Sequence, residues 1–387
     1  MHWRAWIVLT VAAVFGSSSI RACADEVNDH LAAIARAGPQ ASGSREARVA
    51  ADLLSNRGTE ILPRLLLAMD IDNPLAANWY RAVYETIVER ELARAGPEFP
   101  LAELRAIVGD RNHRGHVRRL ALVLCDRLEP GYRQKTVRGL LDDPEFREDA
   151  VDMALAAGGQ ALTNGDSEAA RDQFQRAFEH ARDSNQVTSA AGQLAKLGER
   201  VDIAKHLGLV VDWWLVGPFD APAFTGFARS FAPESQVDLQ AGYVGQDGQS
   251  IVWRRHHTPD PLGMVNLAQA LAPAKEAVAY AYAQLDSPQP QDAQLRTGAD
   301  DNLTVWLNGQ KVFSREQWLN GSRFDRFVTP VKLVRGANRV LVKICQGPQH
   351  KDPQVPNNWT FQLRFCDAQG GGAGLVSSSP EAAGGSP

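Results

Sequence analysis

The hydrophobic pattern of the chain changes once, near residue 206. Before that point apolar residues recur every three or four positions, as at Val49, Leu53 and Leu54. This spacing is typical of amphipathic helices. Gly, Pro and Asn residues interrupt the pattern at intervals and separate the helices into hairpins. We therefore predict stacked helix pairs, a short α-solenoid, over residues 25–206.

From residue 207 onward apolar and polar residues alternate with a period of two. Segments such as "VVDWWLVGPF", "AVAYAYAQL" and "NRVLVKICQ" are rich in aromatic and β-branched residues and are bounded by Gly, Asn and Asp. Short strands of this kind indicate an antiparallel β-sandwich or jelly roll over residues 207–368. One face of "AVAYAYAQ" carries only alanine, which permits close packing against bulky side chains. The predicted fold class is therefore multidomain, α then β.

The two ends of the chain have compositions of their own. Residues 1–24 place an apolar stretch before Ala22-Cys23-Ala24, which is typical of a secretory signal peptide cut after about Ala24 and predicts a secreted or periplasmic protein. Lipidation of Cys23 is the alternative, although Arg21 is unusual so close before it. Residues 369–387, rich in Gly, Ser and Pro, are predicted to be disordered.

Composition excludes several classes of partner. The 387 residues are 44% hydrophobic with a net charge of −4, so the chain suits two globular domains and has no overall attraction to nucleic acid. Once the signal is removed, we expect no integral membrane segment.

Three cysteines follow the signal: Cys125, Cys345 and Cys366. If the strands carrying the last two form a hairpin, Cys345 lies opposite Phe361 or nearby and Cys366 about five residues further along. We therefore expect two separate small buried side chains rather than a disulfide, although pairing stays open.

The stretch "ADDNLTVWLNGQKVFS" contains the sharpest candidate site. Adjacent carboxylates such as Asp300 and Asp301 are costly to bury unless a cation or several N–H donors compensate them. Calcium, which prefers oxygen ligands, is one interpretation. The other is that one carboxylate accepts backbone hydrogen bonds at the start of a strand while its neighbour faces water. Asn308-Gly309 predicts a type I′ hairpin turn, because both of its central residues need positive φ.

Several motifs resemble known families. The stretches "REARVAADLLSNRGTEILPRLLLAMD" and "RGHVRRLALVLCDRLEP" resemble degenerate HEAT repeats, and "GDSEAARDQFQRAFEHARDSNQVTSAAGQLAKLG" resembles a tetratricopeptide-type pair. The order "GPF…DD…VWLNG…GANRVLVK" resembles galactose-binding-like jelly rolls of secreted bacterial proteins, including a module found behind HEAT-type repeats in proteins of unknown function. The Asp-Asp pair is also similar to the calcium site of protective-antigen-type lectin sandwiches, where calcium holds sugar hydroxyls; here Asn308 replaces the usual Asp.

This resemblance implies carbohydrate binding. Aromatic rings stack on sugars, and Asp and Asn bind hydroxyl groups. The candidate ligand-binding residues are Asp300, Asp301, Trp306, Asn308 and Trp359, and the first two are also the candidate calcium ligands. Trp306 is out of phase with its apolar neighbours, so we expect it on the strand face away from the core.

No motif for catalysis is present: the sequence has no G-x-S-x-G, H-E-x-x-H, P-loop or dinucleotide fingerprint. The basic stretch "RNHRGHVRRL" fits either an acidic partner or a solvated helix face. We therefore predict an exported, non-enzymatic protein without a cofactor, calcium aside. Its helical repeats would contact proteins and its jelly roll would bind a glycan or a cell-envelope partner. The alternatives are a purely structural interaction protein, with the β domain as a cap, and an accessory protein of polysaccharide processing.

Overall fold

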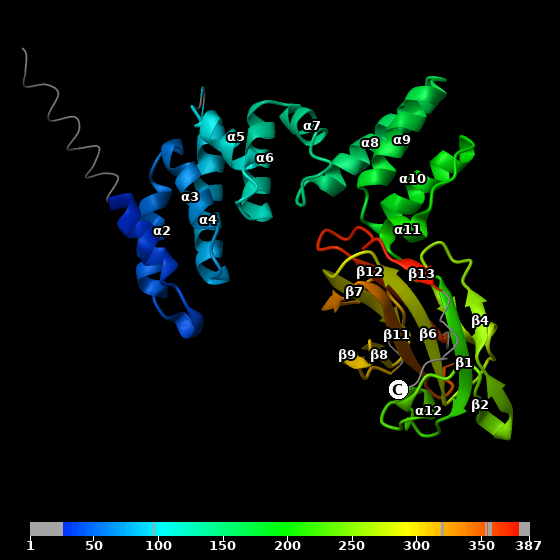
Figure 1. Cartoon of the computed structure of the whole chain (residues 1–387). Coiled ribbons are helices and arrows are strands. Elements are labelled where there is room, and N and C mark those ends of the chain that lie inside the picture. The colour runs from blue at the N-terminus through cyan, green and yellow to red at the C-terminus, as the bar shows by residue number, and fades with distance from the viewer. Residues whose placement is uncertain are drawn as a thin grey trace, which may run out of the picture. The chain divides into compact units, whose positions relative to one another are not determined.

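The computed structural model describes residues 26–94, 96, 98–318, 321–352, 354 and 358–378. The predicted signal peptide lies outside the described residues. Helices are followed by antiparallel strands, which confirms the predicted fold class (Figure 1). The chain forms two compact units, unit 1 (Met1–Phe146) and unit 2 (Arg147–Pro387).

Unit 1 is helical. Residues 26–35 form a helix, and the elements after it are η1 (Pro39–Ala41), α2 (Ser44–Ser55), η2 (Thr59–Ile61), α3 (Leu62–Ala68), α4 (Pro74–Leu92), α5 (Leu101–Gly109), α6 (Gly115–Leu128) and α7 (Tyr132–Val137). Asn73 caps α4, because its side-chain oxygen accepts the backbone N–H groups of Leu75 and Ala76. Buried apolar residues of these helices, such as Leu54, Leu65 and Ile87, supply the core, whereas Val49 and Leu53, which share the predicted spacing with Leu54, are exposed.

The basic stretch of unit 1 is paired within the unit. Arg118 is buried and donates through both terminal nitrogens to Asp143, at 2.9 and 2.7 Å. Arg114 pairs with Asp70 and Asp72. These contacts neutralise the stretch locally, which fits a structural role better than an acidic partner.

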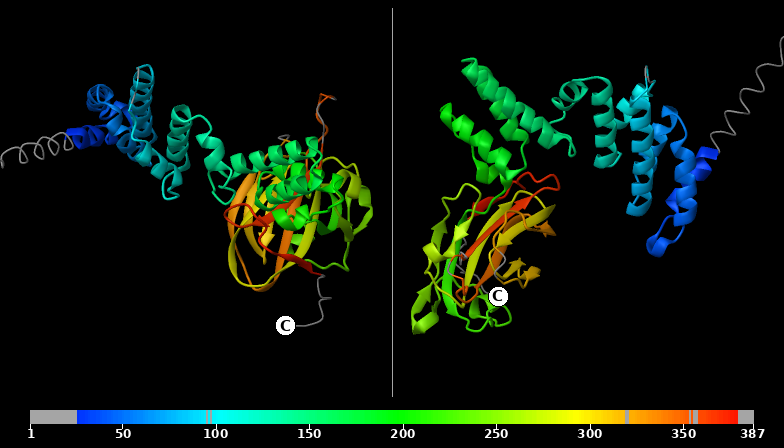
Figure 2. Two further views of the ribbon diagram at one scale, coloured as in Figure 1. Left: turned by 90° about the horizontal axis from the view of Figure 1, so that it is seen from above. Right: turned by 180° about the vertical axis from the view of Figure 1, so that it is seen from behind.

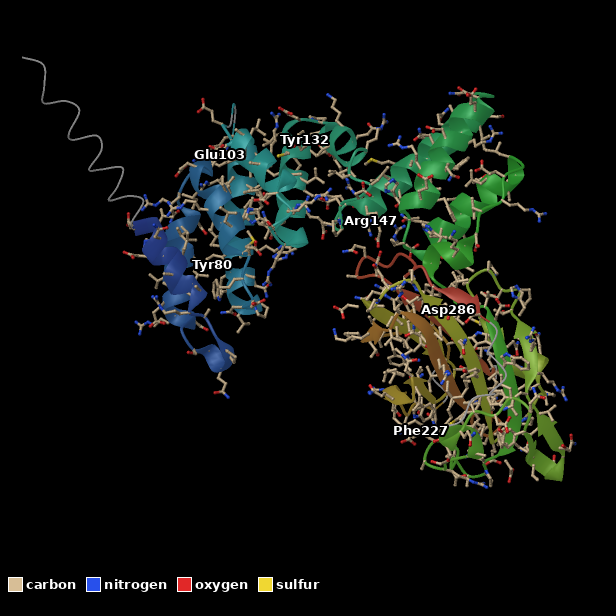
Figure 3. The ribbon with its side chains drawn as sticks, in the orientation of Figure 1. Tyr80, Glu103, Tyr132, Arg147, Phe227 and Asp286 are labelled. Atoms are coloured by element: carbon tan, nitrogen blue, oxygen red, sulfur yellow. The ribbon has the colours of Figure 1, made fainter. Side chains whose placement is uncertain are left out.

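Unit 2 begins with four helices: α8 (Arg147–Thr163), α9 (Ser167–His180), α10 (Ser184–Lys196) and α11 (Ile203–Leu207). They lie at one end of the β-sandwich, and Arg147 in Figure 3 marks where they start (Figures 2 and 3). Their last helix is joined to the sandwich by backbone hydrogen bonds, including Phe365 N–H to the carbonyl of Gly208 and Gly372 N–H to that of His206. The change from helix to strand thus falls inside a single compact unit.

The strands of unit 2 form two large sheets and one hairpin. The larger sheet has the order β4-β1-β6-β11-β8-β9, with β13 paired to β6, and the smaller has the order β10-β7-β12-β5. Strands β2 and β3 form the hairpin, and the short helical elements α12 (Ala232–Ser235), η3 (Gln246–Gly248) and α13 (Leu267–Ala270) lie between strands. The strands are β1 (Asp212–Asp220), β2 (Gly242–Val244), β3 (Ser250–Val252), β4 (Arg254–His257), β5 (Val265–Asn266), β6 (Ala277–Ser287), β7 (Gln291–Ala299), β8 (Leu303–Leu307), β9 (Gln310–Arg315), β10 (Phe327–Leu333), β11 (Gly336–Gln346), β12 (Thr360–Cys366) and β13 (Val376–Ser378).

The main core lies between the two large sheets. The alanine face of β6 points into it, and the bulky side chains that the face accommodates include Trp213, Trp359 and Phe361. The tyrosines of β6 point to the other face of the same sheet, which we call the outer face. There they join a second apolar cluster with Phe219 and Trp253. The larger sheet is therefore apolar on both faces.

A buried ion pair connects the smaller sheet to the end of the helices. Arg364 on β12 is 0% exposed, pairs with Asp325, and donates to the backbone carbonyls of Leu207 and Gly370 at 2.8 and 2.9 Å. Arg296 shares the same carboxylate at 3.1 Å. Each charged side chain of this group has at least one partner, as the cost of burying charge requires.

Another buried group holds a loop against the outer face of the larger sheet. The Lys343 ammonium donates to the carbonyls of Phe227 and Arg229 and pairs with Glu234 at 2.8 Å. Tyr280 donates to the same carboxylate. Phe227 marks this end of the sandwich in Figure 3, opposite the end marked by Asp286. The lysine therefore fixes the loop that covers this part of the face.

One conditional premise and one expectation differ from the structure. Strands β11 and β12 do not form a hairpin, since they belong to different sheets, where β11 pairs with β6 and β8 and β12 with β7 and β5. The three described cysteines are buried and unbridged. The predicted disorder of the C-terminal tail is wrong for residues 369–378, because Val376–Ser378 pair with β6 through backbone hydrogen bonds that do not depend on apolar side chains. Residues 379–387 lie outside the described residues.

Candidate functional site

Asp300 and Asp301 lie at the start of β8, and both are buried, at 7% and 2% exposure. Asp300 accepts the backbone N–H of Gly321, and Asp301 accepts that of Gly347 at 2.7 Å. Neither carboxylate faces water, in contrast to the hydrogen-bonded interpretation in which one of them would. Gln317 closes the segment by donating to the carbonyls of Ala299 and Asp301.

Lys275 is the cation beside this pair. Burial, and next the charge of Asp301, raise the pKa of Asp300 to about 6, while the Gly321 N–H and Lys275 act in the opposite direction. Burial lowers the pKa of Lys275, and the two carboxylates partly restore it. The segment before β6 thus supplies the positive charge that the sequence interpretation assigned to calcium.

The donor set does not fit calcium well. Calcium takes six to eight oxygen ligands, whereas these carboxylates already accept N–H groups and interact with an ammonium group. In the part of the chain that the structure describes, no group of three or more His, Cys, Asp or Glu side chains is placed to hold a metal ion. These contacts favour compensation of the carboxylates by the fold itself over the calcium interpretation.

Asn308 lies at the other end of β8. It and Gly309 have φ angles of 53° and 79°, as a type I′ turn requires. Its side chain is used within the fold: the oxygen accepts the N–H of Arg339 at 2.8 Å, and the amide donates to Asn338. The five residues of β8 lie between Asn308 and Asp301, a strand length of about 16 Å. The structure therefore does not bring these two candidates together.

The two candidate tryptophans lie in different surroundings. Trp306 is half-buried on the outer face, away from the main core, as its phase in the strand predicts. The Lys311 ammonium lies 5.5 Å from the centre of its ring. Trp359 is 1% exposed in the main core and offers no ring face to a ligand.

The most suitable hollow for a small ligand lies beside Trp214, a residue that the sequence interpretation did not select. It has a volume of about 410 Å³ and is formed where β1, β4, β6 and β13 meet. Its polar lining includes Asp212, Arg255, His257, Gln284 and Ser378. A half-buried indole beside several hydrogen-bonding groups is the usual lining of a sugar site.

The charged groups of this hollow are arranged in two contacts. His257 Nδ1 lies 2.8 Å from the Asp212 carboxylate, and the Arg255 guanidinium lies 4.9 Å from the centre of the Trp214 ring. The neighbouring His256 is less exposed, and burial lowers its pKa, as does the charge of His257. Near neutral pH, Arg255 is therefore the constant positive charge of the hollow.

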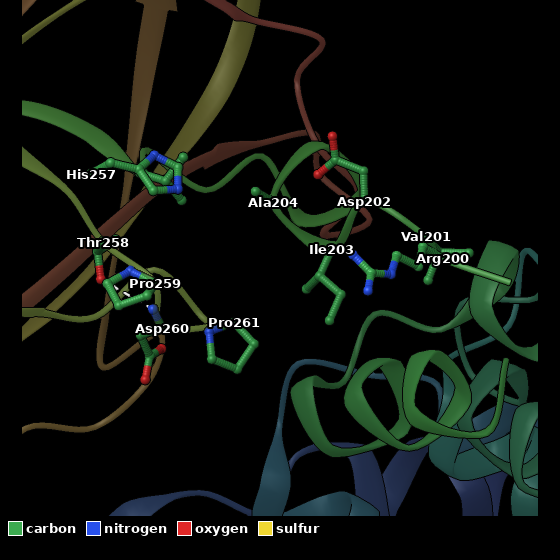
Figure 4. Close-up of a pocket in the computed structure, with 11 residues that line it drawn as sticks. Arg200, Val201, Asp202, Ile203, Ala204, His257, Thr258, Pro259, Asp260 and Pro261 are labelled. Atoms are coloured by element: carbon green, nitrogen blue, oxygen red, sulfur yellow. Dashed lines mark hydrogen bonds between the residues drawn. The ribbon is translucent and has the colours of Figure 1, made fainter. Parts of the chain in front are cut away.

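A second hollow adjoins the first at His257 (Figure 4). It has a volume of about 590 Å³ and lies between the segment around Arg200 and Asp202, just before α11, and the segment from Thr258 to Pro261 after β4. Its lining is more apolar, with prolines on one side and Val201 and Ile203 on the other. It extends the surface available to a ligand toward the helical end of unit 2.

The sequence contains a signal for this site in the strand phases. Trp213 and Trp214 are adjacent in β1, so one must point to each face; Trp213 points into the core and donates to the carbonyl of Val210. The segment "VWRRHH" places Arg255 and His257 on one face of β4. What the sequence does not contain is the pairing of β4 with β1, which brings these residues together.

Comparisons with known proteins identify no family. No protein-family model matches the sequence, and no curated protein matches it. In the described residues no helix is long and apolar enough to cross a membrane.

Solved structures with partial likeness include an anti-sigma factor domain-containing protein, at 12% identity and a TM-score of 0.24, over 42% of this chain and 43% of that one. A GH2 β-galacturonidase from Eisenbergiella tayi is similar at 8% identity and a TM-score of 0.24, over 41% of this chain and 25% of its own. A glycosyl hydrolase family 2 member from Bacteroides cellulosilyticus is similar at 11% identity and a TM-score of 0.26, over 41% and 20%. The chain thus spans less than half the length of each, and likenesses of this size establish neither fold nor function.

Proposed function

We propose that this chain is an exported, non-enzymatic binding protein whose unit 2 binds a glycan in the hollow beside Trp214. The observation that carries the proposal is the indole of Trp214 next to a cluster of hydrogen-bonding side chains. The C–H faces of a pyranose ring stack on an aromatic ring, and its hydroxyl groups need donors and acceptors around the rim.

The size and chemistry of the hollow support a sugar over a purely apolar ligand. Its volume of about 410 Å³ falls within the usual range of ligand pockets. Asp212 can accept hydroxyl hydrogens, Gln284 and Ser378 can donate or accept, and Arg255 can donate. Asp212 is already paired with His257, and Gln284 donates to Ser378, so the support for a sugar is the hydrogen-bonding capacity that these groups and Arg255 retain for hydroxyl groups.

The same lining supports binding rather than hydrolysis. Glycoside hydrolysis normally uses two carboxyl groups that flank the bond to be broken. Asp212 is the one carboxylate among the described residues that line this hollow, and it is paired with His257. Asp300 and Asp301 are buried elsewhere. A binding role therefore needs fewer assumptions than a catalytic one.

The test is a glycan array followed by calorimetry on the purified protein, its Trp214→Ala variant and a Trp318→Ala control. Trp318 is also half-buried but packs on Phe224, away from the hollow. Because an aromatic contact contributes on the order of 1 kcal/mol, we expect loss of the Trp214 ring to weaken glycan binding by at least about ten-fold. If no glycan binds, or if both variants bind like the parent, the proposal is wrong.

Protein contact through unit 1 is the second candidate. Val49 and Leu53 lie four residues apart on α2, hence on one side of that helix, and are 55% and 46% exposed. Exposed apolar side chains that lie together favour interaction with another protein. Capture of a cell-envelope protein by the parent, lost in a Val49→Ser/Leu53→Ser double variant that still unfolds cooperatively, would support it.

A further inference from the structure

One row of side chains crosses the outer face of the larger sheet from edge to edge. Strand pairing places its members directly opposite one another in six successive strands: Arg255 on β4, Trp214 on β1, Tyr282 on β6, Leu341 on β11, Trp306 on β8 and Lys311 on β9. Residues that pair directly across a sheet point to the same face. The row thus has a cation at each end, an indole next to each cation, and two apolar residues in the middle.

Three cations in or beside this row, Arg255, Lys311 and Arg339, have no acidic partners among the described residues. Arg255 and Lys311 contact the rings of Trp214 and Trp306, and Arg339, in the adjacent row, is close enough to Tyr282 to affect its pKa. All three cations are exposed, and none forms an ion pair with any residue that the structure describes. Of the carboxylates adjoining the row, Asp212 is paired with His257, and Glu234 is paired with Lys343. A positive strip therefore lies on a chain whose net charge is −4.

We propose that this row binds an acidic glycan, a chain of uronic acid units that runs across the strands from Trp214 to Trp306. The inference rests on the proposed glycan function and names the class of glycan. Three strand spacings separate the two tryptophans, about 14 Å. A pyranose unit is about as long as one strand spacing, so the row matches an oligosaccharide rather than a single sugar.

Each part of the row has a distinct role in this mode of binding. The two half-buried indoles stack on sugar rings at either end. Arg255, Arg339 and Lys311 pair with the carboxylates, and the bidentate geometry of arginine suits a carboxylate best. Tyr282 and Leu341 are only 6% and 7% exposed, so they form the floor of the row rather than its contacts. A neutral glycan would use the rings and leave the cations unused.

The experiment is calorimetry on the full chain with two probes of equal length, a tetramer of galacturonic acid and a tetramer of galactose, at low and high salt. We expect the acidic tetramer to bind more tightly, and its affinity to fall as salt rises. We expect Arg255→Gln, Arg339→Gln and Lys311→Gln each to weaken it about five-fold, and Trp306→Ala to weaken it about ten-fold. Lys332→Gln, which changes an exposed lysine on the smaller sheet, is the matched control and leaves the affinity unchanged.

The outcomes separate the inference from the proposed function. If the neutral tetramer binds as well as the acidic one, depends on Trp214 and is indifferent to the three cations, the inference is overturned and the proposed function stands. If neither tetramer nor any other glycan binds, both are overturned. If a sulfated glycan or single-stranded DNA of equal charge binds as tightly as the acidic tetramer, the strip is a general anion site and the assignment to uronic acids is wrong.

Discussion

Asp300→Asn is the change that most directly tests the electrostatics of the buried carboxylate pair. The substitution removes one negative charge, keeps the shape of the side chain, and keeps an oxygen to accept the N–H of Gly321. The charged form of Asp300 is disfavoured in the folded state, because its pKa there is raised to about 6 from an ordinary value of 3.8. The parent protein therefore loses stability when Asp300 must ionise in place.

The size and direction of the effect follow from this difference in pKa. Between about pH 4 and pH 6 the folded state holds a proton that the unfolded state has released, so the contribution of Asp300 to stability falls as pH rises through this window. Two pKa units correspond to about 3 kcal/mol at pH 8. The amide introduced by Asp300→Asn does not ionise and avoids this penalty, but its hydrogens need partners. We expect a net gain of about 1–3 kcal/mol in the free energy of unfolding at pH 8 and none at pH 4.

The assay is urea unfolding followed by tryptophan fluorescence, which arises mostly from unit 2, at pH 4, 6 and 8. The difference between variant and parent is compared at each pH, so that other titrating groups cancel. Asp172→Asn, at an exposed position of α9 in the same unit, is the control and should show no dependence on pH. A variant that is less stable than the parent at pH 8, or a gain that is equal at all three values, would refute the reasoning.

The same samples decide between lysine and calcium as the compensating cation. Because Lys275 interacts with both carboxylates, we expect added calcium to leave the stability of the parent unchanged. A calcium-dependent stabilisation that appears in the parent and disappears in Asp300→Asn would instead show that calcium binds this pair.

Two further predictions concern the buried groups of unit 2. Lys343→Met leaves Glu234 buried without its cation and should lower the free energy of unfolding of unit 2 by about 3 kcal/mol, measured by urea unfolding. Lys332→Met, at an exposed ion pair, should lower it by less than about 1 kcal/mol. Equal losses would contradict a role for burial. A fragment that starts at residue 147 should unfold cooperatively on heating. A fragment that starts at residue 212 lacks the Leu207 carbonyl that accepts from Arg364, and its melting temperature should be at least several degrees lower. Equal melting temperatures would show that the helices contribute nothing to the stability of the sandwich.

The sequence predicts the local structure of the β part well, because its signals are local. The Asn308-Gly309 turn, the alanine face of β6 and the outward orientation of Trp306 all depend on a few neighbouring residues. Which strands pair depends instead on residues far apart in the chain. The hairpin considered for the strands of Cys345 and Cys366 does not form for this reason, since β11 and β12 adjoin in sequence but lie in opposite sheets.

The same distinction explains what could be predicted of the candidate site. The cost of burying Asp300 and Asp301 together is visible in the sequence, and so is the need for a compensating charge. That Lys275 supplies it is not visible, because 25 residues and two strands separate it from Asp300 in the chain. The hollow beside Trp214 is not visible either, because β4, β6 and β13 reach it from three different parts of the sequence.

The contacts on the outer face of the larger sheet explain why we propose a binding surface beside Trp214 and not at the opposite end. Near Phe227 the loop covers the face, and this burial is stable because Glu234 and two backbone carbonyl groups satisfy the Lys343 ammonium. The row from Trp214 to Trp306 has no such acidic counterpart among the described residues, so a covering loop would have to bury unpaired cations at a cost of several kcal/mol each. Tyr282 and Leu341 in the middle of the row are already buried, so the part of the row that a ligand would meet is the exposed cations and half-buried indoles toward its two ends, whose charge an acidic ligand would neutralise.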